Sequence, residues 1–292
     1  MNKPRLIIMC GLPASGKTSH AKKLASNPNY KHLSSDAIRY ELYNNCEIQK
    51  DHARVFEIMR DRAINYLNKG YSVIYDATNI TRKSRAAIIS VAPKFASIEC
   101  VLMWKDIESC KRDDATREHS VGEAVIDRMV KQFQAPFYDE GFDFINIVKP
   151  DKYFGEYGDE YAHYIMSAMK IPHDNPNHNN NVLKHCSEAH QYISKKETSY
   201  EVKFAALIHD IGKPYVKSFT DRRGNTTEVA HYYQHQCVGA WMSYGFNYTT
   251  PYIAWLVSTH MDVFLNTKYY RNLPEFLKKD LELLHEADLA GH

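Results

Sequence analysis

Apolar and polar positions follow two different patterns along the chain. In the first half, short apolar runs predict buried strands, and segments with helical spacing lie between them. The predicted strands are residues 5–10, 30–34, 71–75, 97–104 and 142–148. The predicted helices are residues 18–25, a helix that begins near residue 36, 51–68 and 121–133. This alternation is typical of an α/β domain in which helices flank a parallel sheet.

The second half has helical spacing throughout. Helices are predicted at residues 161–169, 182–193, 201–209, 252–259 and 276–289, with another that begins at residue 235. No strand-like alternation interrupts them. Residues 151–159 (DKYFGEYGD) have no periodic pattern, which is typical of a linker. We therefore predict an α/β domain at 1–152 and an all-α domain at 153–292.

The composition is that of a soluble globular protein, because 44% of the 292 residues are hydrophobic and 25% are charged. No apolar segment is long enough to span a membrane, no signal peptide is recognisable, and the six cysteines have no paired spacing. We expect a cytoplasmic protein without structural zinc. The first half carries 23 Lys and Arg and 18 Asp and Glu, and this net +5 suits a phosphate-rich partner. Of the 15 histidines, 11 follow residue 150, so a metal is expected in the second half.

The run GLPASGKT at residues 11–18 fits the Walker A pattern G-x-x-x-x-G-K-[ST]. A predicted strand precedes it and a predicted helix follows, and this context favours a phosphate-binding loop over a glycine turn that opens an ordinary helix. Lys17 is expected to reach the terminal phosphates of a nucleotide, and the Thr18 hydroxyl to bind Mg²⁺. The expected nucleotide contacts are Gly11, Pro13, Ala14, Ser15, Gly16, Lys17, Thr18 and Ser19.

Two further groups follow predicted strands and should lie at the same sheet edge. Asp36 and Arg39 are three residues apart on one helical face. Asp36 is either the N-cap of that helix or a general base, and its position leaves both open. Asp76 directly follows the next predicted strand, where an acid supports Mg²⁺ or the loop hydroxyl, unless it only forms a turn.

Arg112 and Arg117 lie in a charged segment that follows the fourth predicted strand. On one straight helix they would point about 140° apart. They could then grip phosphates from two sides as a mobile lid. The alternative is a solvated helix, whose charge is neutralised locally by Asp113, Asp114 and Glu118.

Together these motifs resemble the 5′-hydroxyl polynucleotide kinase domain of bacteriophage and bacterial RNA end-healing enzymes, over nearly all of residues 1–150. The resemblance rests on the Walker A run, SSDAIR at 34–39, DATN at 76–79, Arg85 and the two lid arginines. It implies that Asp36 deprotonates the acceptor 5′-OH, that Arg39 holds the next phosphate, and that the lid arginines contact the donor. It also implies ATP or another NTP with Mg²⁺, and acceptor contacts at Thr78, Asn79 and Arg85. The chain departs from the phage pattern at Ser34-Ser35, and its lid arginines are five residues apart instead of four.

Histidines and aspartates of the second half lie in or at the ends of separate predicted helices. They are His185, His209, Asp210, His235, His260 and Asp288. A helical bundle builds a metal site from such residues, and nitrogen and oxygen ligands without cysteine favour Mn, Fe, Co, Ni or Mg. Each histidine alone is more simply a hydrogen-bonded core or surface residue.

The order of this set resembles the HD phosphohydrolase superfamily, and LIHDIGK at 207–213 is the signature of that superfamily. The resemblance covers about residues 165–292. It implies one metal held by His185, His209, Asp210 and Asp288. A second ion could use His235 and His260 with Asp210 as a bridge, so the number of ions is one or two. Lys213 could touch a substrate phosphate, and the alternative is a solvated lysine. Five other histidines of this half are taken as structural or as supporting the ligands: His173, His178, His190, His231 and His285.

The two resemblances predict an α/β P-loop kinase domain followed by an all-α HD domain, in a bifunctional RNA end-healing enzyme. One half would phosphorylate 5′-OH ends, and the other would hydrolyse 2′,3′-cyclic phosphate or 3′-phosphate ends for a separate RNA ligase. Known fusions of these modules carry the HD part first. A metabolite or nucleoside kinase joined to an HD nucleotidase is the first alternative, and a nucleotide-gated sensor is the second.

Overall fold

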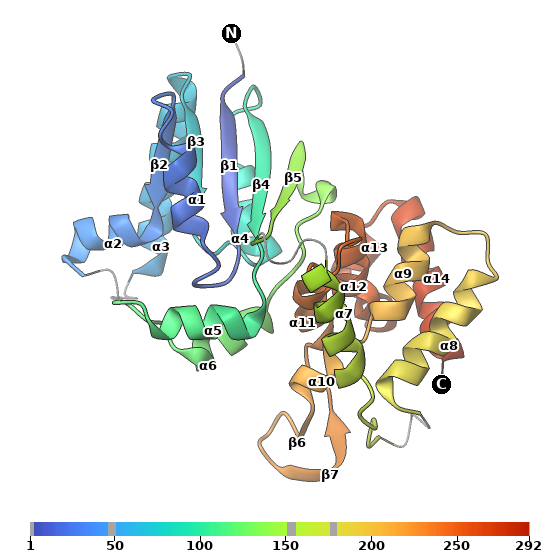
Figure 1. Cartoon of the computed structure of the whole chain (residues 1–292). Coiled ribbons are helices and arrows are strands. Elements are labelled where there is room, and N and C mark those ends of the chain that lie inside the picture. The colour runs from blue at the N-terminus through green and yellow to red at the C-terminus, as the bar shows by residue number, and fades with distance from the viewer. Residues whose placement is uncertain (1–2, 46–50, 151–155, 176–179, 292) are drawn as a thin grey trace. The chain divides into compact units, whose positions relative to one another are not determined.

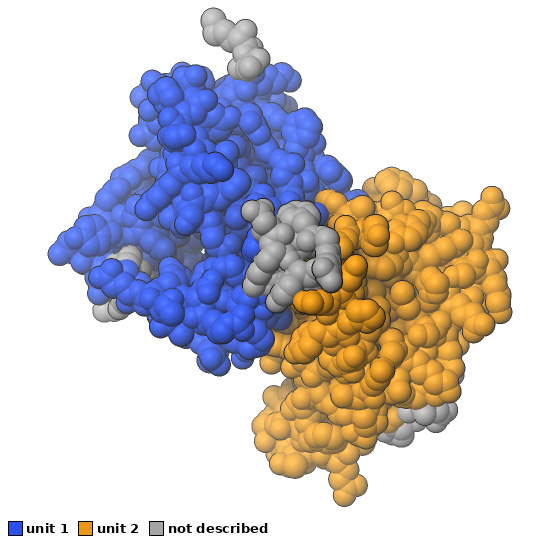
Figure 2. Space-filling view, in the orientation of Figure 1, with its two compact units in different colours: residues 1–129, 136–150 blue, residues 130–135, 151–292 orange. Residues whose placement is uncertain are grey.

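The computed structural model describes residues 3–45, 51–150, 156–175 and 180–291. The chain folds into two compact units, shown in blue and orange in Figure 2. The first contains residues 1–129 and 136–150, and the second contains residues 130–135 and 151–292. The predicted boundary between residues 152 and 153 lies outside the described residues.

The first unit is built on a parallel sheet of five strands in the order β2-β3-β1-β4-β5 (Figure 1). The strands are β1 (Arg5–Cys10), β2 (Tyr30–Ser34), β3 (Ser72–Asp76), β4 (Ser97–Met103) and β5 (Phe144–Val148). The helices are α1 (Lys17–Leu24), α2 (Ser35–Tyr43), α3 (His52–Asn68), α4 (Arg82–Ile89), α5 (Ile107–Ala115), α6 (Glu123–Val130) and the 3₁₀ turn η1 (Tyr138–Glu140). The predicted parallel α/β architecture is confirmed.

The central strand β1 is apolar because it is covered on both sides. Ile7 and Met9 are buried with Ala21 of α1 and with Ile74 and Met103 of the neighbouring strands. All five strands run in one direction, so their carboxyl ends share one edge of the sheet. The Walker A loop and the segments that follow β2, β3 and β4 therefore meet there.

The helical lid differs from its predicted form. Arg112 lies in α5, but α5 ends at Ala115 and Arg117 follows that end. The expectation that both arginines share one straight helix is therefore wrong. Thr116 closes the helix, and Gly122, at φ +84°, precedes α6.

The second unit is mainly helical, with one antiparallel pair of strands. Its elements are α7 (Glu156–Ala168), α8 (Val182–Ser194), α9 (Tyr200–Ile208), α10 (Lys213–Val216), β6 (Ser218–Thr220), β7 (Thr226–His231), α11 (His235–Ser243), α12 (Pro251–Phe264), α13 (Lys268–Arg271) and α14 (Glu275–Ala290). No helix of the described segments is long and apolar enough to cross a membrane.

Three predictions for this unit are wrong in detail. The β6–β7 hairpin contradicts an all-α domain, and three residues of β6 are too few to produce a visible alternation. Helix α7 begins at Glu156, inside the predicted linker. Helix α12 continues through His260 to Phe264, because the apolar residues at 261, 263 and 264 extend the helical pattern past the predicted end.

A segment from before the predicted boundary completes the core of the second unit. The Phe133 ring is fully buried, with its centroid 5.1 Å from that of Trp241 and 6.3 Å from that of Tyr244, both edge-on. The Ala135 N–H donates to Ser258 Oγ at 3.3 Å. Residues 130–135 therefore pack with α11 and α12.

Candidate active sites

The loop between β1 and α1 has the tight geometry that its glycines permit. Gly11 lies at φ +153° and Gly16 at φ +94°. A Cβ at Gly11 would lie 2.7 Å from the Met103 carbonyl oxygen, so a side chain would displace the loop from β4. The Gly11 N–H donates to the Thr78 carbonyl at 2.9 Å, which ties the loop to the end of β3.

Lys17 is buried at the start of α1, and its Nζ donates to the Leu12 carbonyl at 2.7 Å. Burial lowers the pKa of Lys17, and the nearby Asp76 carboxylate opposes that shift. Within the described residues, the buried Ser15 Oγ has no hydrogen-bond partner. The other loop residues are a buried Pro13, Ala14 at φ +58°, and exposed Thr18 and Ser19.

Asp76 is the last residue of β3, and it is buried. Its Oδ2 lies 2.9 Å from Nε2 of His32, which projects from the adjacent strand β2. The alternative of a simple turn-forming aspartate is therefore wrong. The sequence did not indicate His32, because its partner depends on strand pairing. Strand β2 pairs with β3 in a register that sets Ser34 beside Asp76, and His32 lies two residues before Ser34 on the same face of β2.

Asp36 and Arg39 lie together on α2. Arg39 Nη1 donates to Asp36 Oδ1 at 2.8 Å, and the side chains are 7% and 62% exposed respectively. Ser34 caps this helix, so the N-cap alternative for Asp36 is wrong. Arg39 Nη2 also lies 3.3 Å from Nδ1 of His52 on α3, a contact that the sequence did not indicate.

The three predicted acceptor contacts beyond β3 are Thr78, Asn79 and Arg85, and they belong to the segment that holds the Walker A loop in place. Buried Asn79, at φ +43°, donates from Nδ2 to the Met9 carbonyl at 2.8 Å. Arg85 is fully buried, donates to both carboxylate oxygens of Glu140 at 2.8 and 2.6 Å, and reaches the Asn79 carbonyl at 3.0 Å. Thr78 is half-buried. A guanidinium enclosed in this way contacts its own chain, so the predicted substrate role of Arg85 does not fit.

Both lid arginines are exposed, and an aspartate orders the loop beside them. Arg112 Nη2 donates to Ser109 Oγ at 2.7 Å, and Arg117 Nη1 lies 3.1 Å from Asp114 Oδ1. Lys105 follows β4 and donates from Nζ to the Ala14 carbonyl at 3.0 Å. The sequence motifs did not single out Lys105. Its position just after the fourth predicted strand could have indicated a residue near the Walker A loop.

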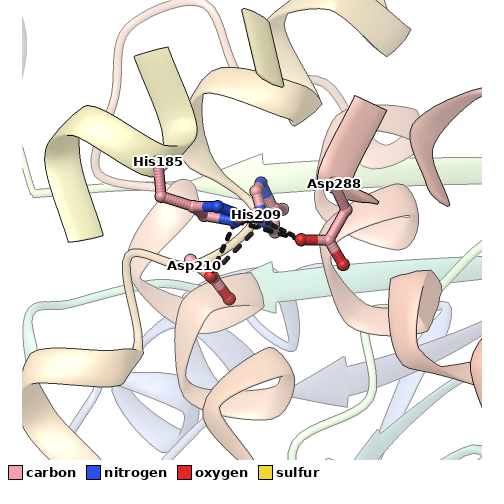
Figure 3. A group of neighbouring side chains, drawn as sticks. All are labelled: His185, His209, Asp210 and Asp288. Atoms are coloured by element: carbon pink, nitrogen blue, oxygen red, sulfur yellow. Dashed lines mark hydrogen bonds and ion pairs between the residues drawn. The ribbon is translucent and has the colours of Figure 1, made fainter. Parts of the chain in front are cut away.

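In the second unit, four predicted metal ligands converge from α8, α14 and the segment after α9 (Figure 3). They are His185, His209, Asp210 and Asp288, and one potential ligand atom of each lies within 4.8 Å of the others. His185 Nε2 lies 3.2 Å from His209 Nε2 and 3.0 Å from Asp288 Oδ1. Asp210, His235 and His260 form a second group, in which the two Nε2 atoms are 3.1 Å apart.

The orientation of the imidazoles fits a cation. In all four, Nδ1 lies 2.8 or 2.9 Å from a backbone carbonyl oxygen, which can only accept a hydrogen bond. The neutral rings therefore carry their proton on Nδ1 and direct the Nε2 lone pair toward the group. Carbonyl partners of this kind orient metal-bound histidines. The carbonyls belong to Gly291, Ala206, Tyr232 and Val257.

The charges of the cluster favour the same occupant. Burial opposes ionisation of Asp210, but the Lys213 ammonium, 2.5 Å from its Oδ2, holds the pKa of Asp210 well below its ordinary value. Burial also opposes a charged His209, yet the Asp210 carboxylate raises the pKa of His209 well above normal. Burial lowers the pKa of His260 to about 3. A divalent cation would take the place of the proton that these carboxylates favour on His209, and ionised carboxylates beside neutral imidazoles in a buried site suit such an ion.

Comparisons with known proteins concern the first unit most directly. A family model described as an AAA domain matches residues 6–136. The first unit is a P-loop kinase-like domain. The bifunctional polynucleotide phosphatase/kinase of Schizosaccharomyces pombe is 25% identical over 165 residues, which cover 54% of this chain and 36% of the yeast protein. The 6-phosphofructo-2-kinase/fructose-2,6-bisphosphatase of Aquarana catesbeiana is 30% identical over 109 residues, which cover 31% of this chain and 23% of the frog protein.

Solved structures also match in part. A Pnkp1/Rnl/Hen1 RNA repair complex contains a chain with 22% identity and a TM-score of 0.41, covering 45% of this chain and 44% of that one. A gluconokinase from Sinorhizobium meliloti 1021 has 16% identity and a TM-score of 0.38, covering 51% of this chain and 84% of that one. The matched part of the chain spans little more than a third of the length of the yeast protein and about a quarter of the length of the frog protein.

Proposed function

We propose that the first unit transfers the γ-phosphate of ATP, or of another NTP, to the 5′-OH of a nucleic acid, in the first instance RNA. The observation that supports this most is the placement of Lys17, Asp76 and the Asp36–Arg39 pair at one sheet edge. The match to a yeast polynucleotide phosphatase/kinase favours a polymeric acceptor.

Each residue has a distinct part in this reaction. The exposed Asp36 carboxylate accepts the proton of the attacking hydroxyl, and the Arg39 guanidinium beside it binds the next phosphate of the acceptor. Lys17 and the backbone of the loop hold the donor phosphates, and Asp76 supports the Mg²⁺ that accompanies the nucleotide. Arg112 and Arg117 stabilise the charge on the transferred group.

The kinase proposal is tested by transfer of labelled phosphate from ATP to 5′-OH RNA and DNA oligonucleotides. Asp36→Asn should lower kcat by about 10²- to 10⁴-fold, since it removes the base, and should leave ATP affinity intact. Asp61→Asn, at an exposed position on α3, is the matched control. Wild-type protein that phosphorylates no oligonucleotide would rule out this proposal.

A small-molecule kinase is the second candidate, and the match to a frog 6-phosphofructo-2-kinase favours it. It predicts that sugar phosphates or nucleosides are phosphorylated at least as well as oligonucleotides. Turnover measured with both acceptor classes under the same conditions distinguishes the two kinases.

We infer that the second unit is a metal-dependent phosphohydrolase that acts on 2′,3′-cyclic phosphate or 3′-phosphate ends. His185, His209, Asp210 and Asp288 would hold one divalent ion, and Asp210, His235 and His260 a second. Bound divalent ions would polarise a phosphate ester and lower the pKa of a nearby water. Lys213, which lies against Asp210, would stabilise phosphate charge. With both activities, the chain would prepare RNA ends for a separate ligase.

Metal content is the direct test of this second site. Purified protein loaded with Mn²⁺ should hold two ions per chain, and His260→Gln should reduce that number to one because it alters only the second group. Asp210→Asn should weaken both, since this carboxylate is common to the two groups. The control is His163→Gln, at an exposed position on α7. Protein that binds no divalent metal at any of these residues would refute the proposal.

A further inference from the structure

The β6–β7 hairpin begins and ends beside the metal-ligand cluster. Its first strand follows Lys213, whose Nζ lies 2.5 Å from Asp210 Oδ2. Its second strand leads through Tyr232 to His235, and the Tyr232 carbonyl is 2.8 Å from His235 Nδ1. Figure 1 shows the hairpin, in orange, extending away from α10. The hairpin therefore connects two residues of the cluster region with a protruding arm.

The base of the arm is held in place. The Tyr232 hydroxyl donates to the His173 carbonyl, and the Lys213 ammonium lies 5.5 Å from the centroid of the Tyr232 ring. At the tip, the Asp221 carboxylate accepts hydrogen bonds from the backbone of Arg223 and Asn225. These hydrogen bonds from the Asp221 carboxylate fix the conformation of the turn that joins β6 and β7.

Cationic and aromatic side chains alternate along this arm. The Arg222 guanidinium lies 4.8 Å above the Tyr233 ring, and that ring stacks on His231 with centroids 5.2 Å apart and an angle of 8°. Lys217, the residue before β6, has its ammonium 5.8 Å from the Phe219 ring and also pairs with Asp174 at 2.6 Å. Arg222 and Phe219 are exposed. Such a surface offers flat rings for bases and positive charge for phosphates.

We propose that the β6–β7 hairpin binds single-stranded nucleic acid and leads its terminal phosphate toward the metal-ligand cluster. This inference rests on the proposed function of the second unit. The exposed Phe219 ring offers a face to any base. The stacked column of His231, Tyr233 and Arg222 presents the flat Arg222 guanidinium, which adds a stacking plane and charge. An enzyme that acts on many RNA ends needs contacts of this sequence-tolerant kind. A protein partner would be better served by a contiguous apolar patch, which the mixed arm does not offer.

The test measures binding of a fluorescein-labelled 12-nucleotide RNA to the full chain by anisotropy. The RNA carries a 5′-phosphate, so that it is not an acceptor for the kinase half. Combined Arg222→Ala and Tyr233→Ala should weaken binding at least tenfold, and Phe219→Ala should weaken it several-fold. Tyr233→Phe keeps the ring and should retain wild-type affinity. Lys195→Ala, at an exposed cation after α8, is the charge control.

Unchanged affinity of the double variant, with thermal unfolding like that of the wild type, would overturn the inference. So would equal weakening by Lys195→Ala, because only bulk charge would then matter. Equal loss with Tyr233→Phe would show that the hydroxyl, and not the aromatic ring that carries Arg222, accounts for binding, and would also overturn it. The anisotropy measurement reports RNA binding and does not require hydrolysis. A metal cluster without phosphohydrolase activity would therefore contradict the proposed function of the second unit, whereas RNA binding by the hairpin would still be tested.

Discussion

At the scale of single residues, Arg85 was predicted to contact the substrate, but the structure gives it a role in stability. An arginine downstream of the DATN run suggested an acceptor contact, but its partner Glu140 lies 55 residues later, so no local pattern could reveal the pairing. The enclosed ion pair and the bond to Asn79 hold the segment below the nucleotide loop. Breaking a buried pair is costly because it leaves an uncompensated charge.

Arg85→Met is therefore expected to lower the free energy of unfolding by about 3–5 kcal/mol, since the buried Glu140 loses its bidentate partner and keeps the Phe137 N–H and the more distant Arg82 guanidinium. The measurement is urea denaturation of the full chain. The control is Arg62→Met, which removes the exposed pair with Glu41 and should cost about 1 kcal/mol or less. Wild-type stability of Arg85→Met, together with a raised KM for the acceptor, would restore the substrate role.

At the scale of elements, the lid depends on one buried carboxylate in the last turn of α5. Asp114 Oδ2 accepts hydrogen bonds from the Ser120 hydroxyl at 2.7 Å and from the N–H groups of Val121 and Gly122, both at 2.9 Å. Although burial favours the neutral acid, these bonds hold the pKa of Asp114 below its ordinary value. The loop that carries Arg117 is ordered by this aspartate.

Asp114→Asn should cost about 1–3 kcal/mol of unfolding free energy at neutral pH, because charge-assisted bonds are lost. The folded-state pKa is lowered, so the stabilising contribution is complete above the unfolded value of about 3.9 and is lost as pH falls through the folded value. Denaturation curves of wild type and variant should therefore converge under acid. A gap that stays constant down to the acid end would contradict this account, and Asp61→Asn serves as control.

At the scale of the whole molecule, the chain divides into two compact units, and their boundary is not a single point in the sequence. Residues 130–135 belong to the second unit, although the sequence pattern assigned them to the first half. Phe133 packs edge-on against the rings of Trp241 and Tyr244, so the core of the helical unit contains a side chain from far upstream.

Phe133→Ala should destabilise the second unit by about 3–5 kcal/mol, because it leaves a cavity beside Trp241. Tryptophan fluorescence during urea unfolding reports this, since Trp241 and Trp255 belong to the second unit and Trp104 to the first. Phe276→Ala, whose ring is 69% exposed on α14, should change stability little. Loss of the transition of the first unit alone would show that residues 130–135 stabilise the other unit.

The sequence by itself determined the features that depend on local chemistry. Apolar runs located β1 and the other strands of the sheet, and the spacing of Gly11, Gly16 and Lys17 located the nucleotide loop. Both features depend on residues that are close together in the sequence, so a local pattern is enough to predict them. The order of the histidines and aspartates also indicated the metal-ligand candidates and their convergence, but not the distances between them.

Only the tertiary structure decided the contacts between distant segments. It brought Asp288 of α14 beside His185 of α8, 103 residues away, and paired His32 with Asp76 across two strands. It also enclosed Arg85 and added the β6–β7 hairpin. Packing sets these distances, and packing depends on the whole chain at once, so a local pattern contains no information about which partner a buried charge will find.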